Sequence, residues 1–357
     1  MHGLVQLSAR RWLRASGQLE TFKQQCIKRL AAAFPTGEYD NWATCRSLFA
    51  HVQVVSGYQP SKDMIETWAT LLHNGGWYAC SQGLYEVAQQ MLGEARIARK
   101  KKLGTEDVAT LHSTTMFAAV LLDRGRWEEA EEMFMHVIGT LKTKLGVDHP
   151  YMLSSMGNLA STYQKQGRWE EAEKLEVQVM ETRKTKLGAD HLDTLTGMDN
   201  LASIYIDQGW WEKAEKLQVQ VMETRKTKLG ADHPSTLTSM GNLASTYSNQ
   251  GRWEEAEKLE VQVMETRKTK LGADHLDTLT GMDNLASIYR DQGRGKQAEK
   301  LSVQVMETLK TKLGADHSHT LTSMNNLAST YQEQGRWEEA EKLSLQEMET
   351  LKTKLGR

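Results

Sequence analysis

The sequence repeats itself every 42 residues, and this period constrains the fold more than any other feature. A Leu-Gly pair closes each period, at residues 103–104, 145–146, 187–188, 229–230, 271–272, 313–314 and 355–356. Another glycine keeps the same step and divides each period into two similar stretches, at Gly83, Gly125, Gly167, Gly209, Gly251, Gly293 and Gly335. Two helix-length stretches per period are typical of an α-solenoid.

The fifth repeat, residues 231–272, shows the helical pattern within one period. Its first stretch has apolar residues at steps of three and four, namely Leu237, Met240, Leu243, Ala244 and Tyr247. Its second stretch has a similar stripe of Trp253, Ala256, Leu259 and Val263. Such stripes predict two amphipathic helices, each packed on its partner and on a neighbouring repeat. We therefore expect an all-α stack of antiparallel helix pairs.

Short segments predict where these helices begin and end. Gly251 lies between the two stretches and Gly272 follows the second, where a positive φ ends a helix without steric cost. Asp232 is the predicted N-terminal cap of the next helix, and Pro234 its predicted first-turn proline.

The tryptophan that opens the second helix is predicted to belong to the core. Repeat six carries Gly295 at this position. Loss of a mostly buried indole costs about 3 kcal/mol, so we expect a less stable joint there.

The repeats account for residues 64–357, after a segment of 63 residues. We place their boundaries at 64–104, 105–146, 147–188, 189–230, 231–272, 273–314 and 315–357. The 1–63 segment is expected to form helices at 4–15, 19–34 and 41–55, as a linker to the repeats. The first repeat, with Gly75 and Gly76 where later repeats have Leu and Ala, is expected to act as an irregular cap.

A longer period lies over the shorter one. Residues 167–205 and 251–289 are identical over 39 positions. Repeats three and four therefore resemble repeats five and six as two copies of one 84-residue block, which indicates a tandem duplication.

The composition narrows the possible environments and partners. The chain has 44 basic and 46 acidic residues, so it lacks the basic excess that nucleic-acid binding needs. No apolar run approaches the ~18 residues of a membrane helix, and three cysteines without metal-ligand spacing fit a reducing compartment. The N-terminus lacks the pattern of a secretory signal. We expect a cytoplasmic protein that binds neither nucleic acid nor membranes.

The repeat resembles the tetratricopeptide repeat in its 42-residue form, which is found in kinesin light chains and in many fungal and bacterial proteins. The matching residues are Asn242-Leu243-Ala244, Tyr247, the run from Gln250 to Leu259, and Lys270-Leu271-Gly272. This resemblance implies a right-handed α-solenoid of stacked antiparallel helix pairs. It implies the fold more strongly than the role.

The first residues, Met1-His2-Gly3-Leu4, resemble the segment that closes the nucleotide-binding module of NB-ARC and NACHT signalling ATPases. In fungi such modules are commonly followed by a similar linker and 42-residue repeats. This resemblance implies that the chain is the sensor half of such an ATPase. No G-x-x-x-x-G-K-[ST] phosphate-binding loop occurs in the sequence.

Residues capable of catalysis occur but do not form a pattern that indicates an enzyme. Five histidines occupy one inter-repeat loop position and are too far apart to share a metal ion, namely His149, His191, His233, His275 and His317. Glu254-Glu255 and its copies occupy the polar start of a helix, where acids complement the helix dipole. We therefore expect no enzyme activity, no metal and no cofactor.

The first helices carry the candidate binding residues. In tetratricopeptide proteins these helices line an inner groove, and an asparagine before the conserved leucine often binds a peptide backbone. The matching residues here are Asn158, Asn200, Asn242, Asn284 and Asn326. One turn away lie Ser203, Ser245 and Ser287, and negative charge comes from Asp199 and Asp283. The alternative is that the asparagines were copied by duplication or bond within their own repeat.

These residues predict a small, polar, mildly acidic groove that accepts a neutral or basic extended segment. The favoured function is a non-catalytic scaffold that binds a peptide or protein. The alternatives are the ligand-sensing half of a signalling ATPase and a kinesin-light-chain-like cargo adaptor.

Overall fold

The computed structural model describes residue 8 and residues 11–355, and these residues form helices and turns without a strand. The helices α2 (Leu19–Ala33) and α3 (Trp42–Ser56) precede the repeats, with short 3-10 helices at Tyr39–Asn41 and Lys62–Met64. The paired helices follow as α4 (Ile65–Ser81), α5 (Tyr85–Leu103), α6 (Val108–Asp123), α7 (Trp127–Lys144), α8 (Pro150–Lys165), α9 (Trp169–Leu187), α10 (Leu192–Asp207), α11 (Trp211–Leu229), α12 (Pro234–Asn249), α13 (Trp253–Leu271), α14 (Leu276–Asp291), α15 (Gly295–Leu313), α16 (Ser318–Glu333) and α17 (Trp337–Leu355).

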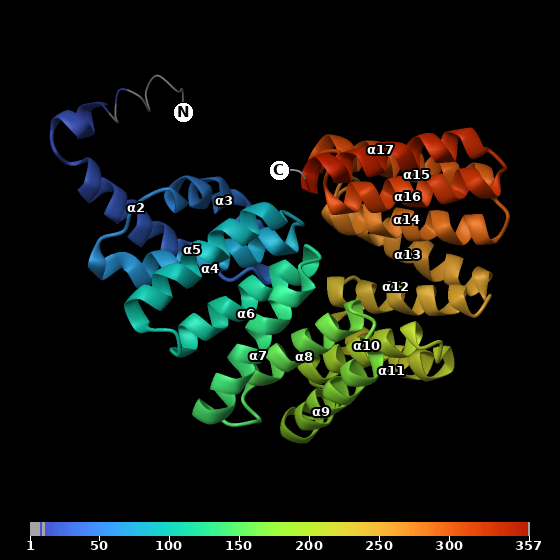
Figure 1. The fold of residues 1–357 in the computed structure, drawn as a ribbon, viewed down its shortest axis with the longest axis horizontal. Coiled ribbons are helices and arrows are strands. Elements are labelled where there is room, and N and C mark those ends of the chain that lie inside the picture. Colours follow the sequence, from blue (N-terminus) through green and yellow to red (C-terminus); the bar gives the residue numbers. More distant parts are fainter. Residues whose placement is uncertain (1–7, 9–10, 356–357) are drawn as a thin grey trace. The chain divides into compact units, whose positions relative to one another are not determined.

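From α4 to α8 and from α10 to α17, each helix packs on the next helix in the sequence, which confirms the predicted all-α stack of helix pairs (Figure 1). The chain divides into two compact parts, Met1–Leu175 and Glu176–Arg357. Within the second part the first helices of successive repeats also touch, α12 with α14 and α14 with α16. The first helices therefore form one side of the stack there.

Two kinds of glycine end the two helices of each repeat. Gly251, after a first helix, has φ 75°, and Gly272, after a second helix, has φ 100° and ψ 159°. Residues with a side chain rarely adopt either conformation, so both positions require glycine. This requirement explains why both glycines keep the 42-residue step.

A histidine caps the first helix of repeats three to seven, so the prediction that Asp232 caps α12 was wrong. His233 Nδ1 accepts a hydrogen bond of 3.2 Å from the backbone N–H of Ser235. The other four loop histidines bond the N–H two residues ahead in the same way. Asp232 instead lies 3.2 Å from Lys270 Nζ. Pro234 is the first residue of α12, as predicted.

Small and large side chains alternate in the core. Ala256 and its six equivalents are at most 1% exposed. Around them, Leu237, Met240 and Val263 form one cluster with Met222 of the preceding repeat. Full burial of such a side chain contributes about 2 kcal/mol, and here part of it depends on the neighbouring repeat.

The tryptophans that open the second helices are not core residues, contrary to the prediction. Trp211 is 41% exposed, Trp253 40% and Trp337 67%. Each is the first residue of its helix, and side chains lean toward the helix N-terminus, so the ring projects past the helix end. Gly295 therefore does not replace a buried indole, and the basis for a weak joint in repeat six is removed.

Before the first repeat, α2 and α3 form, close to the predicted positions, and Arg11–Ala15 is also helical. The motif Met1-His2-Gly3-Leu4 lies outside the described residues.

Packing explains the irregular glycines of α4. A Cβ on Gly75 would lie 2.9 Å from Val52 Cγ1 of α3, and one on Gly76 would lie 2.5 Å from Leu92 Cγ of α5. The segment thus covers α4 as a preceding repeat covers later first helices.

The histidine caps yield a stability prediction. We expect His233→Ala to lower the free energy of unfolding by about 1 kcal/mol, because the Ser235 N–H loses its acceptor. His233→Asn keeps a side-chain acceptor and should retain most of the stability. Urea denaturation monitored by circular dichroism measures both. Equal stability of His233→Ala and the parent chain would show that the cap contributes nothing.

Candidate functional site

The predicted binding residues lie on one face of the first helices. On α12, Thr238 and Ser245 are exposed and Asn242 between them is half-buried, at the spacing of one helix face. We call this face and its equivalents in the second part of the chain the polar stripe, formed by Thr196, Asn200, Ser203, Thr238, Asn242, Ser245, Thr280, Asn284, Ser287, Thr322, Asn326 and Ser329. Asn158 of α8 occupies the same position in the first part and is also half-buried.

Several asparagine amides of the polar stripe already have partners inside the stack. Asn200 Nδ2 donates to Glu176 Oε1 of the preceding repeat at 3.3 Å. Asn284 lowers the pKa of Glu260, and Asn326 lowers that of Asp283, so each amide lies close to a carboxyl of the preceding repeat. These carboxyls therefore orient the amides beside the exposed surface.

The two aspartates expected to make the groove acidic point into the stack. The Asp199 carboxylate pairs with Arg225, and their side chains are only 11% and 7% exposed. Ser239 Oγ accepts from the same guanidinium at 2.6 Å. Asp283 has no such arginine, because Leu309 occupies the place of Arg225. The exposed charge from these two aspartates is therefore small.

Asp283 and two glutamates are buried carboxyls with raised pKa values. Burial raises the pKa of Asp283 to about 7, although interactions with Ser323 and Asn326 lower it in part. Burial also raises the pKa of Glu260 to about 7, opposed by the charge of Arg267 and by Asn284. Glu176 has the same shift, opposed by Arg183 and Asn200.

These interior groups explain the 84-residue period. A Cβ on Gly281 would lie 3.1 Å from Glu260 Oε1, and one on Gly197 would lie 3.3 Å from Glu176 Oε1. Glycine in the next first helix thus makes room for each glutamate. Repeat four instead has Gln218, whose Oε1 accepts from Thr246 Oγ1 at 2.6 Å. Successive interfaces therefore alternate between two polar arrangements.

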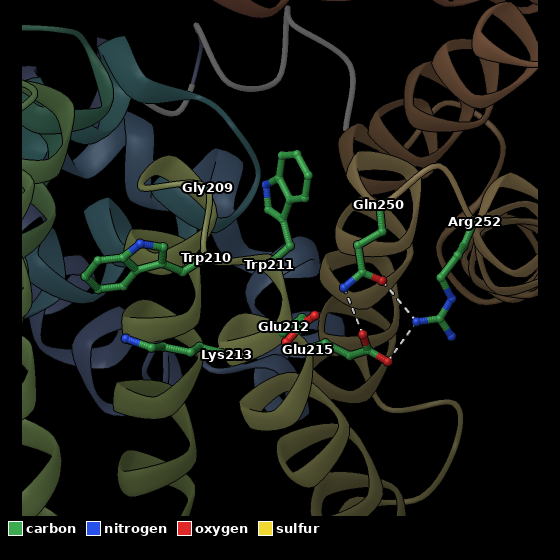
Figure 2. A pocket seen from close by; sticks show the side chains of 8 residues that line it. All are labelled: Gly209, Trp210, Trp211, Glu212, Lys213, Glu215, Gln250 and Arg252. Atoms are coloured by element: carbon green, nitrogen blue, oxygen red, sulfur yellow. Dashed lines mark hydrogen bonds and ion pairs between the residues drawn. The ribbon is translucent and has the colours of Figure 1, made fainter.

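A second surface follows the turns between the two helices of each repeat. It contains two clefts, of about 650 and 570 Å³, which we call the turn clefts. The first is lined by Trp210, Trp211, Glu212, Lys213, Glu215, Gln250 and Arg252 (Figure 2). The second is lined by Arg252, Trp253, Glu254, Glu255, Glu257, Gln292 and Arg294. Neither cleft could be predicted from the sequence pattern, because that pattern assigned the tryptophans to the core.

One serine and histidine lie close together, in α6 and α4. Ser113 Oγ is 3.4 Å from His73 Nδ1, and Arg99 Nη1 donates to the same Oγ at 2.8 Å. All three residues are buried, and burial lowers the pKa of His73 to about 3. This arrangement fixes α4, α5 and α6 together. Within the described ranges, no three His, Cys, Asp or Glu side chains lie where they could hold a metal ion.

The sequence matches a family model described as tetratricopeptide repeat over residues 115–185, 151–227, 193–269, 250–311 and 274–353. A second tetratricopeptide-repeat model matches residues 68–109. These matches cover most of the chain. The chain belongs to the tetratricopeptide-repeat family.

A curated protein is similar to part of this tetratricopeptide-repeat chain. It is 37% identical over 114 residues to a nucleotide-binding leucine-rich repeat (NLR)-like protein of Hyaloscypha variabilis, covering 32% of this chain and 12% of that protein. The chain thus spans about an eighth of the length of this curated relative.

Several solved structures are similar to this chain. Nearly identical repeats of a putative kinesin light chain from Podospora anserina are 31% identical, covering 58% of this chain and 98% of theirs, with a TM-score of 0.47. The quorum sensor NprR from B. thuringiensis is 13% identical, with coverage of 97% and 94% and a TM-score of 0.60. NprR in complex with its cognate peptide NprX gives 17% identity, 76% coverage of both chains and a TM-score of 0.54. None of the helices in the described ranges is long and apolar enough to cross a membrane.

The buried glutamates yield a pH prediction. The pKa of Glu260 is about 7 in the folded chain and lower when unfolded, so its contribution to stability is complete at low pH and is lost as the pH rises through 7. We expect Glu260→Gln to change little at pH 5 and to stabilise the chain by about 1–2 kcal/mol at pH 8. Gln218 shows that the position accepts an amide.

Urea denaturation at the two pH values measures this difference. Glu265→Gln, on the exposed face of the same helix, is the control and should have the same effect at both pH values. If Glu260→Gln were more destabilising at pH 8 than at pH 5, the buried carboxylate would be a net stabiliser.

Proposed function

We propose that this protein is a non-catalytic interaction scaffold and that the polar stripe binds an extended segment of a peptide or protein partner. The observation that carries the proposal is the recurrence of Asn and Ser on the exposed face of adjoining first helices, α12, α14 and α16. A backbone segment laid across these helices meets the same groups once per repeat.

The chemistry of the polar stripe suits a peptide main chain. An asparagine amide offers both a donor and an acceptor, so it can bind a peptide group independently of the neighbouring side chains. The buried Glu176 carboxyl holds Asn200 in a defined position, which lowers the entropy cost of binding. The partner is neutral or basic in this proposal, because exposed Asp207 and Asp291 extend the stripe.

The comparisons support this class of function. The similar structure of NprR is a complex with its cognate peptide NprX. This similarity supports the capacity of the architecture to bind peptides. The remaining parts of the proposal are a cytoplasmic location and binding that requires no cofactor, nucleic acid or membrane.

Substitution of two asparagines tests the polar stripe. Peptides selected from a random display library on the parent chain serve as ligands, and fluorescence anisotropy gives the affinity. Asn242→Ala with Asn284→Ala should weaken binding about tenfold, through the loss of about 1.4 kcal/mol of hydrogen bonding. Gln262→Ala with Gln304→Ala, two exposed amides on second helices, is the matched control and should bind normally. Selection of only acidic peptides that bind both variants equally would contradict the proposal.

A second candidate function is the ligand sensor of a signalling ATPase. The 37% identity to part of an NLR-like protein favours it. In this case the solenoid would bind the same class of partner and report binding to a nucleotide-binding module. Sequencing the genomic region upstream of Met1 tests the candidate. An in-frame coding region with a phosphate-binding loop would support it, and a stop codon directly upstream would exclude it.

A further inference from the structure

We propose that the turn clefts form a second binding surface, separate from the polar stripe, and that each cleft takes one arginine or lysine side chain from a basic segment of a partner protein. The two clefts lie in successive repeats and share several components, although the first has Trp210 and Lys213 where the second has Arg252 and Glu255. Each contains a half-exposed indole, a glutamate next to it in the sequence, and a Gln–Arg–Glu network (Figure 2).

The arginines of these clefts are already neutralised. In the first cleft, Arg252 Nη1 lies 2.9 Å from Glu215 Oε1, and Gln250 Nε2 donates to Glu215 Oε2 at 2.8 Å. Arg252 Nη2 lies 2.6 Å from Glu255 Oε1, and the guanidinium is 3.9 Å from the centre of the Tyr247 ring. In the second cleft, Arg294 pairs with Glu257 at 2.8 Å. These cations are therefore poorly available to an acidic ligand.

The glutamate that follows each indole has no cation. Among the described residues, neither Glu212 nor Glu254 has an ion pair or hydrogen bond through its side chain. Both carboxylates are exposed, and they adjoin Trp211 and Trp253 in the two clefts. A carboxylate without an ion pair and a half-exposed indole that line one cleft both attract a cation, the carboxylate by charge and the indole by the cation–π interaction. The same chain shows this contact, since Lys213 Nζ lies 3.8 Å from the centre of the Trp210 ring.

Repeat six shows that the fold does not require the Trp-Glu pair. Gly295 and Lys296 replace both residues together. Nevertheless α15 begins at the equivalent residue and has the same length as α11 and α13, 19 residues. The Arg–Glu pair also persists there, because Arg336 pairs with Glu299 at 2.7 Å, whereas Gln334 Nε2 donates to the Gly295 carbonyl at 2.9 Å. The indole and its glutamate are thus additions to a surface that is stable without them.

A designed peptide tests the turn clefts directly. The probe is a fluorescein-labelled peptide with arginine at roughly every fourth position, separated by glycine and serine, so that several spacings between clefts can be met. A matched peptide has citrulline, a neutral isostere, in place of each arginine. We expect the arginine peptide to bind in fluorescence anisotropy at low salt, and the citrulline peptide to bind at least tenfold more weakly.

Charge-neutral variants locate the site without disturbing the fold. Glu212→Gln with Glu254→Gln should weaken binding of the arginine peptide about fivefold, and Trp211→Ala with Trp253→Ala should do so at least as strongly. Asn242→Ala with Asn284→Ala should weaken the arginine and citrulline peptides by the same factor, because the amides bind the main chain, and this result separates the turn clefts from the polar stripe. Glu223→Gln with Glu265→Gln, two exposed second-helix acids outside the clefts, is the charge-matched control. Circular dichroism checks that each variant is folded.

A gain-of-function variant completes the test. Gly295→Trp with Lys296→Glu should create a third cleft and tighten binding about fivefold; the only close neighbour of a new Cβ there is the flexible Gln334 side chain, at 3.1 Å. Equal weakening by the control glutamates would show non-specific charge attraction and overturn the proposal. Concentration-dependent self-association that the cleft variants abolish would also overturn it, by making a second copy of the chain the occupant.

Discussion

The burial of each helix pair against the next is the interaction on which the rest of the structure depends. One pair leaves apolar faces uncovered, and the cluster of Leu237, Met240 and Val263 closes only with Met222 of the preceding repeat. Stability is then a sum over repeats and interfaces. The N-terminal helices meet the same requirement at the start, where Val52 of α3 lies over Gly75 of α4. Apolar packing sets the 42-residue step, and the glycines that end the helices recur with the same step.

Polar groups inside the stack add a second level of organisation. Glu176 and Glu260 face a glycine of the next repeat, whereas Arg225 pairs with Asp199 in the repeat between them. The result is an alternation of two interface types, which matches the 84-residue duplication. The interior carboxyl of Glu176 also accepts a hydrogen bond from Asn200. The interior of the stack thus orients the groups of the polar stripe, and this link connects stability to binding.

The fold could be predicted because its signals are local and repeated. Apolar steps of three and four and the helix-ending glycines do not depend on distant residues. The predictions failed at residues whose contacts depend on a neighbouring residue or helix, or on the position of the residue at the end of its own helix. Trp253 has the spacing of a core residue, but it begins its helix and projects past the end. Asp232 is a good capping residue, but His233 is one position closer to the helix start. Asp199 reads as a surface acid until Arg225 is placed beside it. The turn clefts need side chains from two successive repeats, so no single repeat reveals them.

In the proposed function, repetition places identical polar groups along adjoining first helices so that an extended chain can bind across them. The most direct test is a crystal structure of the protein with a peptide selected from a random library. We expect the peptide main chain to cross α12 and α14 within hydrogen-bond distance of the Asn242 and Asn284 amides. A peptide that contacts only second helices, with both amides unchanged, would contradict it.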